Sequence, residues 1–318
     1  MTVKLTRLFS ILILIALTSC KNEDSPQPVV LLEMLNIMET ESINRYEINW
    51  SEFRSEVLAI TKSDQSPTTI NVAIKRALTL LEDNHSFYRP TEGQNIYGER
   101  SLSCNNVFVD EPNIPEDIGY VRVTRFSGNS NDETGKTFAQ DIHEKIRQAD
   151  HDEIKGWIVD LRSNTGGNMW PMLAGIGPIL GDGICGYFID PDETAIGWSY
   201  SDGTSYYDGY PLTQITNPYD LIAQNPKVAI LMDNGTASSG EAITAAFIGR
   251  LNTKSFGVAT CGISTANRSF ELSDGSSLVL TVSYMADRNK NKLGTSIEPD
   301  VEVNIQNIIQ AAIDYIYE

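Results

Sequence analysis

Residues 227–250, KVAILMDNGTASSGEAITAAFIGR, decide the fold of this chain. Residues 228–232 are apolar and partly β-branched, and the run has the length of a buried strand. Asp233-Asn234-Gly235 breaks the run, and the small, apolar residues 240–247 are compatible with a helix. The stretch therefore predicts a buried strand, a tight turn and a helix, with Ser238 and Ser239 on the turn.

A serine on such a turn is exposed, and the helix dipole favours negative charge beside it. The backbone N–H of Ser239 could donate to an oxyanion, so the arrangement suits Ser238 as a nucleophile. Alternatively, one of the two serines only caps the helix, with Glu241 in its first turn. The stretch by itself leaves both alternatives open.

Composition excludes several classes of function. The 318 residues carry a formal net charge of −18, which argues against a general nucleic-acid or anionic-membrane surface. The histidines and cysteines show no metal-ligand spacing, so we expect no metal and no organic cofactor. An ordinary share of apolar residues predicts a globular protein with ample length for a core.

The N-terminus resembles a bacterial lipoprotein signal. Lys4 and Arg7 precede a short apolar segment, residues 8–17, and small residues then lead to Cys20. The resemblance implies cleavage of residues 1–19, acylation of Cys20, a polar tether over residues 20–28 and a lipid-anchored place in the cell envelope. The alternative is an ordinary cleaved signal followed by a chance cysteine.

The other cysteines, Cys104, Cys185 and Cys261, allow at most one intrachain disulfide. Their wide spacing favours buried free thiols.

The chain divides into two expected parts. Apolar residues at helical spacing predict a helical module over residues 29–87, which ends in Asp-Asn-His-Ser-Phe and so carries His85. From residue 118 onward, strands and helices alternate, which predicts an α/β core with largely parallel central strands within residues 88–318. Within that core, residues 192–212 predict an aromatic-rich hairpin that either lines a substrate cleft or is structural.

Two further stretches carry candidate site residues. Residues 157–167, WIVDLRSNTGG, form a strand that ends in Gly166 and Gly167, whose N–H groups could approach an oxyanion closely or belong to an ordinary turn. His85 could act as a general base, or it could simply suit the negative end of a helix. His143 and His151 lie among charged residues and are expected to be solvated.

Asp287 and Glu298 are the candidate acids to orient that histidine. Asp287 follows the long predicted strand beyond the serine, and Glu298 stands in IEPD. We prefer Asp287 because it ends that strand.

Together the DNHS segment, the VDLRSNTGG turn, the TASSGE turn and IEPDV resemble peptidase family S41 over roughly residues 85–303. The resemblance implies a crotonase/ClpP-like α/β core, Ser238 as nucleophile, and oxyanion donors at Ser239, Gly166 and Gly167. Gly240 stands where the family usually has a second serine. The lysine that pairs with the serine in much of the family would fall at position 263, where this chain has Ile263. A tricorn-like arrangement with His85 as base therefore fits better. About 30 residues between His85 and the core are too few for the family's PDZ domain.

The sequence thus predicts a cell-envelope serine peptidase that acts on peptide or protein substrates. The main alternative is an inactive carrier on the same scaffold. An unrelated esterase is disfavoured, because Thr236 replaces the first glycine of the G-x-S-x-G turn. Substrate and oligomeric state are not predicted.

Overall fold

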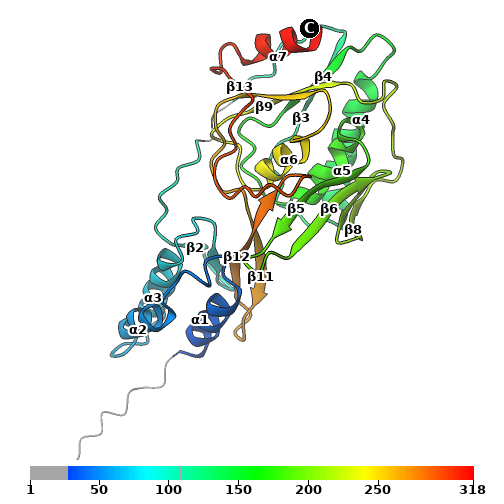
Figure 1. The fold of residues 1–318 in the computed structure, drawn as a ribbon. Coiled ribbons are helices and arrows are strands. Elements are labelled where there is room, and N and C mark those ends of the chain that lie inside the picture. The colour runs from blue at the N-terminus through cyan, green and yellow to red at the C-terminus, as the bar shows by residue number, and fades with distance from the viewer. Residues whose placement is uncertain (1–27, 106, 108) are drawn as a thin grey trace, which may run out of the picture.

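The computed structural model describes residues 28–105, 107 and 109–318. The expected signal segment, Cys20 and nearly all of the tether lie outside the described residues. As predicted, the described chain begins with helices, which form the smaller lobe in Figure 1. They are α1 (Val29–Glu41), α2 (Trp50–Ile60) and α3 (Pro67–Leu80).

The larger lobe is built on a parallel sheet with the order β13-β10-β9-β4-β3. Its strands are β3 (Ile118–Arg122), β4 (Gly156–Asp160), β9 (Lys227–Met232), β10 (Thr253–Gly257) and β13 (Val301–Glu302). The expected α/β core is confirmed, and the quoted stretch supplies its middle strand, β9, and the helix that follows.

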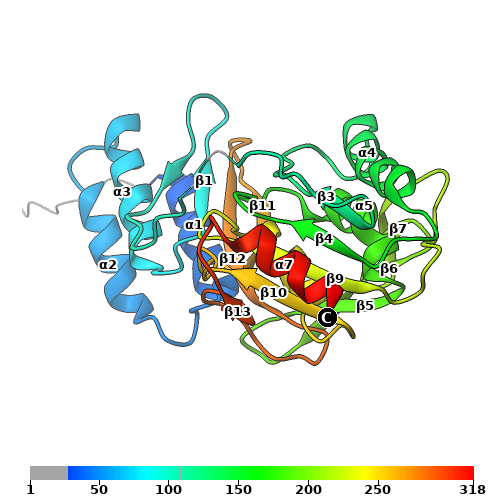
Figure 2. The same cartoon turned by 90° about the horizontal axis from the view of Figure 1, so that it is seen from above.

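Side chains of consecutive strand residues point to opposite faces of this sheet, so its buried strands place apolar side chains on both faces. Helices cover each of the two faces. Ile158, Ala229 and Leu231 pack under α7 (Ile308–Tyr317), which lies across one face in Figure 2. Val159 and Ile230 pack into the cluster on the other face. That face is covered by α4 (Glu133–Ala149), α5 (Met169–Leu180) and α6 (Ser239–Phe247).

A second, antiparallel sheet was not predicted as a unit. Its path is β2-β1-β12-β5-β6-β7-β8, with β11 beside β12. Its strands are β1 (Phe87–Arg89), β2 (Ile96–Tyr97), β5 (Gly183–Ile189), β6 (Ala195–Ser201), β7 (Thr204–Tyr207), β8 (Tyr210–Gln214), β11 (Thr265–Glu271) and β12 (Ser277–Ala286). The expected hairpin over residues 192–212 is part of this sheet, in which the long strand β12 pairs with β1 at its start and with β5 at its end.

The antiparallel pair of β11 and β12 joins the two lobes (Figure 1). Leu278 and Leu280 of β12, with Leu272 at the end of β11, share one buried cluster with the three N-terminal helices. The helices therefore bury their apolar faces against strands from the far end of the chain. His85, between α3 and β1, lies where the lobes meet.

The aromatic hairpin is largely structural. Trp198 is fully buried and Tyr200 is 3% exposed, so both belong to the core. Tyr210, at the start of β8, is 70% exposed instead. None of the helices in the described part of the chain is long and apolar enough to cross a bilayer.

His143 is buried, against the expectation that it is solvated. It lies on α4 with Ile142 and Ile146 on the side that packs against α5, and its ring meets the edge of Tyr219. Burial, with the charge of Arg147 in addition, lowers the pKa of His143. The folded protein therefore holds this imidazole neutral.

Removing His143 should reduce acid sensitivity. The unfolded chain takes up a proton on this residue near its ordinary pKa of about 6.5, while the folded chain resists protonation. Stability from this residue is therefore complete above that pH and is lost as pH falls below it. His143→Leu should narrow the difference in melting temperature between pH 8 and pH 5, measured by circular dichroism. The control is His151→Leu at an exposed position, which should keep the wild-type difference. A His143→Leu protein with the wild-type difference in melting temperature would contradict this account.

Candidate active site

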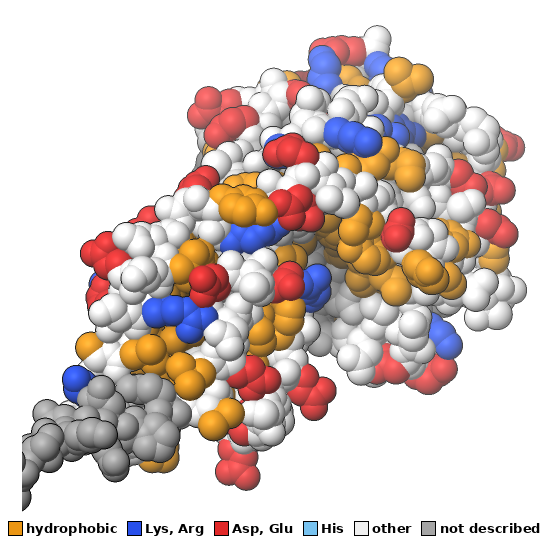
Figure 3. All heavy atoms as spheres, turned by 60° about the horizontal axis from the view of Figure 1, so that its bottom comes forward, with side chains coloured by type: hydrophobic (Ala, Val, Ile, Leu, Met, Phe, Trp, Pro, Cys, Tyr) orange, Lys and Arg blue, Asp and Glu red, His pale blue; other side chains and the backbone are white. Residues whose placement is uncertain are grey.

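Ser238 and His85 meet between the two lobes. The Ser238 Oγ lies 3.0 Å from His85 Nε2, although the residues are 153 positions apart. Figure 3 shows the surface hollowed between the lobes, with hydrophobic side chains gathered on the larger lobe beside the hollow. The structure thus brings together a hydroxyl and an imidazole in the geometry of a nucleophile and its base.

The backbone at Ser238 is strained. Its φ of 52° and ψ of −115° lie where a non-glycine residue is rarely found. Ser238 directly precedes α6, so its side chain stands at the positive end of the helix. Its hydroxyl contacts His85, and it is half-buried.

Glu241 fixes this turn, a role that the sequence analysis missed. Its buried carboxylate accepts hydrogen bonds from Ser238 N at 2.8 Å, Thr260 Oγ1 at 2.6 Å, Gly262 N at 2.9 Å and Ile263 N at 3.1 Å. Burial raises the pKa of Glu241, while these donors act against the rise. The spacing of Ser238 and Glu241 is that of a capping box, which was the available sequence signal.

Two backbone N–H groups near Ser238, those of Ser239 and Gly167, are available as hydrogen-bond donors. Neither Ser239 N nor Gly167 N donates to another group in the described chain, and Gly167 is exposed. Ser239 Oγ donates to Gly167 O at 2.8 Å, which ties the two turns together. Gly166 differs from the expectation: it is buried and its N–H donates to Asn164 Oδ1 at 3.0 Å.

The close approach of these turns requires glycine at two positions. A Cβ on Gly166 would lie 2.7 Å from Ala237 O. A Cβ on Gly240 would lie only 2.3 Å from Asn164 O. This contact leaves no room for a side chain at position 240.

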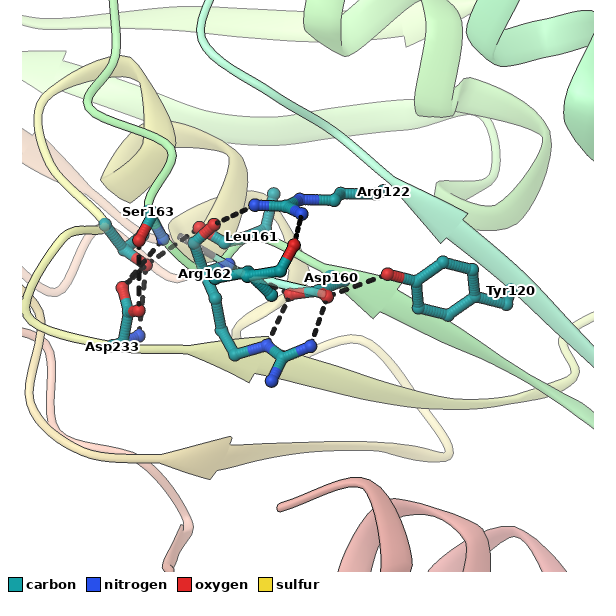
Figure 4. Close-up of polar contacts among 9 residues, drawn as sticks. Tyr120, Arg122, Asp160, Leu161, Arg162, Ser163 and Asp233 are labelled. Atoms are coloured by element: carbon teal, nitrogen blue, oxygen red, sulfur yellow. Dashed lines mark hydrogen bonds and ion pairs between the residues drawn. The ribbon is translucent and has the colours of Figure 1, made fainter. Parts of the chain in front are cut away.

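A buried ion pair stands at the end of β4, where the turn that carries Gly167 begins (Figure 4). The Asp160 carboxylate accepts two hydrogen bonds from the Arg162 guanidinium, at 2.9 and 2.6 Å, and one from Tyr120 Oη at 2.8 Å. Ser163 N donates to Asp233 Oδ1 at 2.8 Å, which joins the ends of β4 and β9. These contacts fix the turn that carries Gly167.

His85 is held neutral. Burial of its ring, with the positive charge of Arg100 in addition, lowers the pKa of His85 to about 4. Its backbone N–H donates to Asp83 Oδ1 at 2.9 Å, and its carbonyl accepts from Asn267 Nδ2 at 3.2 Å. A neutral imidazole beside a hydroxyl is the state that a general base needs.

The structure does not place Asp287 against His85, which corrects the expected third residue. The Asp287 carboxylate accepts hydrogen bonds from its own turn: Asn289 N at 2.8 Å, Asn291 N at 2.9 Å and Asn291 Nδ2 at 2.8 Å. An aspartate readily closes a turn in this way, so its position after β12 serves local structure. Glu298, the other candidate, is exposed.

Thr265 takes the place expected for the acid. Its Oγ1 lies 2.9 Å from His85 Nδ1, and it is 6% exposed. No motif in the sequence marks this residue, because the contact joins positions 180 apart.

A disulfide joins Cys104 to Cys261, so the expectation of free thiols is wrong for this pair and right for buried Cys185. Cys261 lies between Thr260 and Gly262, both of which donate to Glu241. The bond therefore fastens the segment that follows β2 to the loop that supports the Ser238 turn.

Breaking this disulfide should lower the stability of the fold. It closes a loop with a sequence separation of 157, so its loss should cost about 2–5 kcal/mol of unfolding free energy. Denaturant unfolding should show the same loss for reduced wild type and for Cys104→Ser. Reductant should not lower the unfolding free energy of Cys104→Ser any further. A further decrease would show that the reductant acts on something other than this disulfide.

Among the described residues, no group of three or more His, Cys, Asp or Glu side chains is placed to hold a metal ion.

Three comparisons place the chain among known proteins. The family model for peptidase family S41 matches residues 117–303, more than half of the chain. The nisin-resistance protein of Lactococcus lactis subsp. lactis is 27% identical over 299 residues, which are 92% of this chain and 87% of that protein. A probable CtpA-like serine protease of Staphylococcus haemolyticus is 26% identical over 191 residues, 59% of this chain and 34% of the relative.

A solved structure, that of a lipoprotein from Streptococcus agalactiae, shares the fold. It matches with a TM-score of 0.71 and 22% identity, and the match covers 97% of this chain and 99% of that one. The predicted resemblance and fold class are thus confirmed. The chain spans most of the Lactococcus relative but about a third of the staphylococcal one.

Proposed function

The chain belongs to peptidase family S41, and on this premise we propose that it hydrolyses peptide bonds with Ser238 as nucleophile and His85 as general base. The observation that carries the proposal is the 3.0 Å contact between Ser238 Oγ and His85 Nε2 beside two available backbone N–H groups. Family membership alone does not distinguish an active peptidase from a carrier, whereas an assembled site favours catalysis.

The geometry supports an acyl-enzyme mechanism. Ser238 Oγ attacks the peptide carbonyl carbon while its proton passes to His85 Nε2. The N–H groups of Ser239 and Gly167 donate to the resulting oxyanion, each contributing about 3 kcal/mol to the barrier reduction. The C–N bond then breaks as His85 protonates the leaving amine. Water, deprotonated by His85, attacks the ester and releases the second product, which restores Ser238.

We place the protein outside the cytoplasm, held by a lipid on Cys20. The Cys104–Cys261 disulfide supports an oxidising compartment. The sequence before the described residues supports the anchor, as does the fold shared with a streptococcal lipoprotein. Mass spectrometry of the membrane-extracted protein should find an acylated Cys20 at the N-terminus; an unmodified chain that begins elsewhere would contradict the anchor.

Nisin is a specific candidate substrate, because the Lactococcus relative that covers most of the chain is named for resistance to it. Incubation of nisin with wild type and with Ser238→Ala, followed by mass spectrometry, should give fragments only with wild type. Intact nisin in both samples would remove it from the substrate range.

A carrier on the same scaffold is the alternative, and covalent labelling separates the two. A fluorophosphonate loses fluoride to an activated serine, and the mass of the product then shows a phosphonyl group on Ser238. A carrier has no activated serine and would remain unlabelled. Labelling of another serine, with Ser238 unmodified, would equally contradict the proposal.

A further inference from the structure

We propose that Thr265 is the positioning residue for His85: its hydroxyl oxygen accepts the Nδ1–H of the imidazole and so leaves Nε2 free to take the proton of Ser238. The inference rests on the proposed function, since only a base needs Nε2 free. It assigns to an uncharged hydroxyl the task that a carboxylate performs in serine hydrolases with an acid as third residue.

The two ring nitrogens of His85 have separate partners. Nδ1 lies 2.9 Å from Thr265 Oγ1, and Nε2 lies 3.0 Å from Ser238 Oγ. A neutral imidazole carries a hydrogen on only one of these nitrogens, and a threonine hydroxyl can either donate or accept. If Thr265 donated to Nδ1, the hydrogen would sit on Nε2 and Ser238 would face no base. The productive state therefore has Thr265 as acceptor.

Strand β11 presents this hydroxyl from a fixed frame. Thr265 and Asn267 of β11 both contact His85, on either side of the register shift between Ala266 and Asn267. Asn267 Nδ2 donates to the His85 carbonyl at 3.2 Å, and Asn267 Oδ1 accepts from Thr281 Oγ1 at 2.9 Å. One residue of β11 thus holds the backbone of His85, and the other holds its ring.

The opposite side of His85 is fixed as well. Asp83 Oδ1 accepts from the backbone N–H groups of His85 and Ser86, at 2.9 and 2.8 Å. Ser86 Oγ in turn accepts from Thr281 N on β12 at 2.9 Å. With the backbone held in this way, the remaining freedom of His85 is rotation of its side chain, and the contact with Thr265 restricts it.

The test compares Thr265→Val with Thr265→Ser. Valine keeps the β-branched shape and the packing at the start of β11 but removes the hydroxyl, whereas serine keeps the hydroxyl. The tautomer is read at pH 7 from ¹⁵N NMR spectra of protein labelled at histidine nitrogens, and His85→Gln identifies the His85 signals. The rate of fluorophosphonate labelling of Ser238 is measured on the same samples. Melting temperatures confirm that each variant is folded.

Wild type and Thr265→Ser should show hydrogen on Nδ1 of His85 and should label at rates within about threefold of each other. Thr265→Val should lose the pure Nδ1–H state and label about 10- to 100-fold more slowly, by analogy with the cost of removing the partner that orients a metal-ligating histidine. Hydrogen on Nε2 in wild type would overturn the inference. So would a Thr265→Val protein that keeps either the tautomer or the labelling rate of wild type.

Failure of the proposed function gives a different result. If wild type is not labelled at Ser238, the peptidase proposal fails first. The spectra then decide by themselves whether Thr265 sets the tautomer of His85: an unchanged tautomer in Thr265→Val overturns the inference.

Discussion

Replacement of Ser238 by alanine is expected to reduce peptide hydrolysis about 10⁴-fold or more, because the nucleophile of the acyl-enzyme is lost. The fold should not change. Alanine keeps the Cβ at the strained position, and the contact of the backbone N–H with Glu241 does not involve the hydroxyl. Initial rates on a cleaved peptide measure the first effect, and the melting temperature measures the second.

Ser273→Ala is a matched control, because Ser273 is exposed on the turn between β11 and β12, away from the site. It should keep wild-type rates. A Ser238→Ala protein that retains substantial activity would show that another group attacks the substrate. A Ser238→Ala protein that unfolds would leave the rates uninterpretable, and in that case phosphonyl labelling of wild type at Ser238 would decide.

Replacement of His85 by alanine should have the second largest effect. Loss of the general base should lower kcat about 10²- to 10⁴-fold, since the hydroxyl of Ser238 then has no proton acceptor. Exposed His151→Ala should leave kcat unchanged. Wild-type kcat in His85→Ala would require a different base.

The pH profile of wild type gives an independent check on this base. Because the pKa of His85 is lowered to about 4, the imidazole stays unprotonated down to about pH 5. The acid limb of kcat/KM should therefore fall near pH 4 and not near the ordinary pKa of histidine. In His85→Ala, any residual kcat/KM should no longer fall near pH 4. A wild-type limb near pH 6.5 would contradict the lowered pKa of His85.

The parts of the site that the sequence predicted depend on short stretches. Ser238 and Ser239 lie on one strand–turn–helix unit, so local pattern was enough to place them together. His85 could be paired with Ser238 only through the family resemblance, because 153 positions separate the two residues. The centre of the parallel sheet was predictable for the first reason, since β4 and β9 are short apolar runs, each followed by a turn and a helix.

The parts that were missed depend on contacts between distant segments. Thr265 meets His85 only because β12 holds β11 and β1 on either side of it, and no local pattern encodes that pairing. The pairing of Cys104 with Cys261 likewise follows from the fold and not from a local pattern. His143 is an instructive error: charged neighbours suggested a solvated residue, although Ile142 and Ile146 indicate the helical face that is buried.

The central claim is that this chain cleaves peptide bonds with Ser238. The most direct measurement is mass-spectrometric digestion of a mixed peptide library by the chain from Ser25 onward, with Ser238→Ala and His85→Ala in parallel. The account predicts new peptide termini with wild type and none above background with either variant. Equal cleavage by wild type and Ser238→Ala would contradict it, as would no cleavage by wild type together with an unlabelled Ser238.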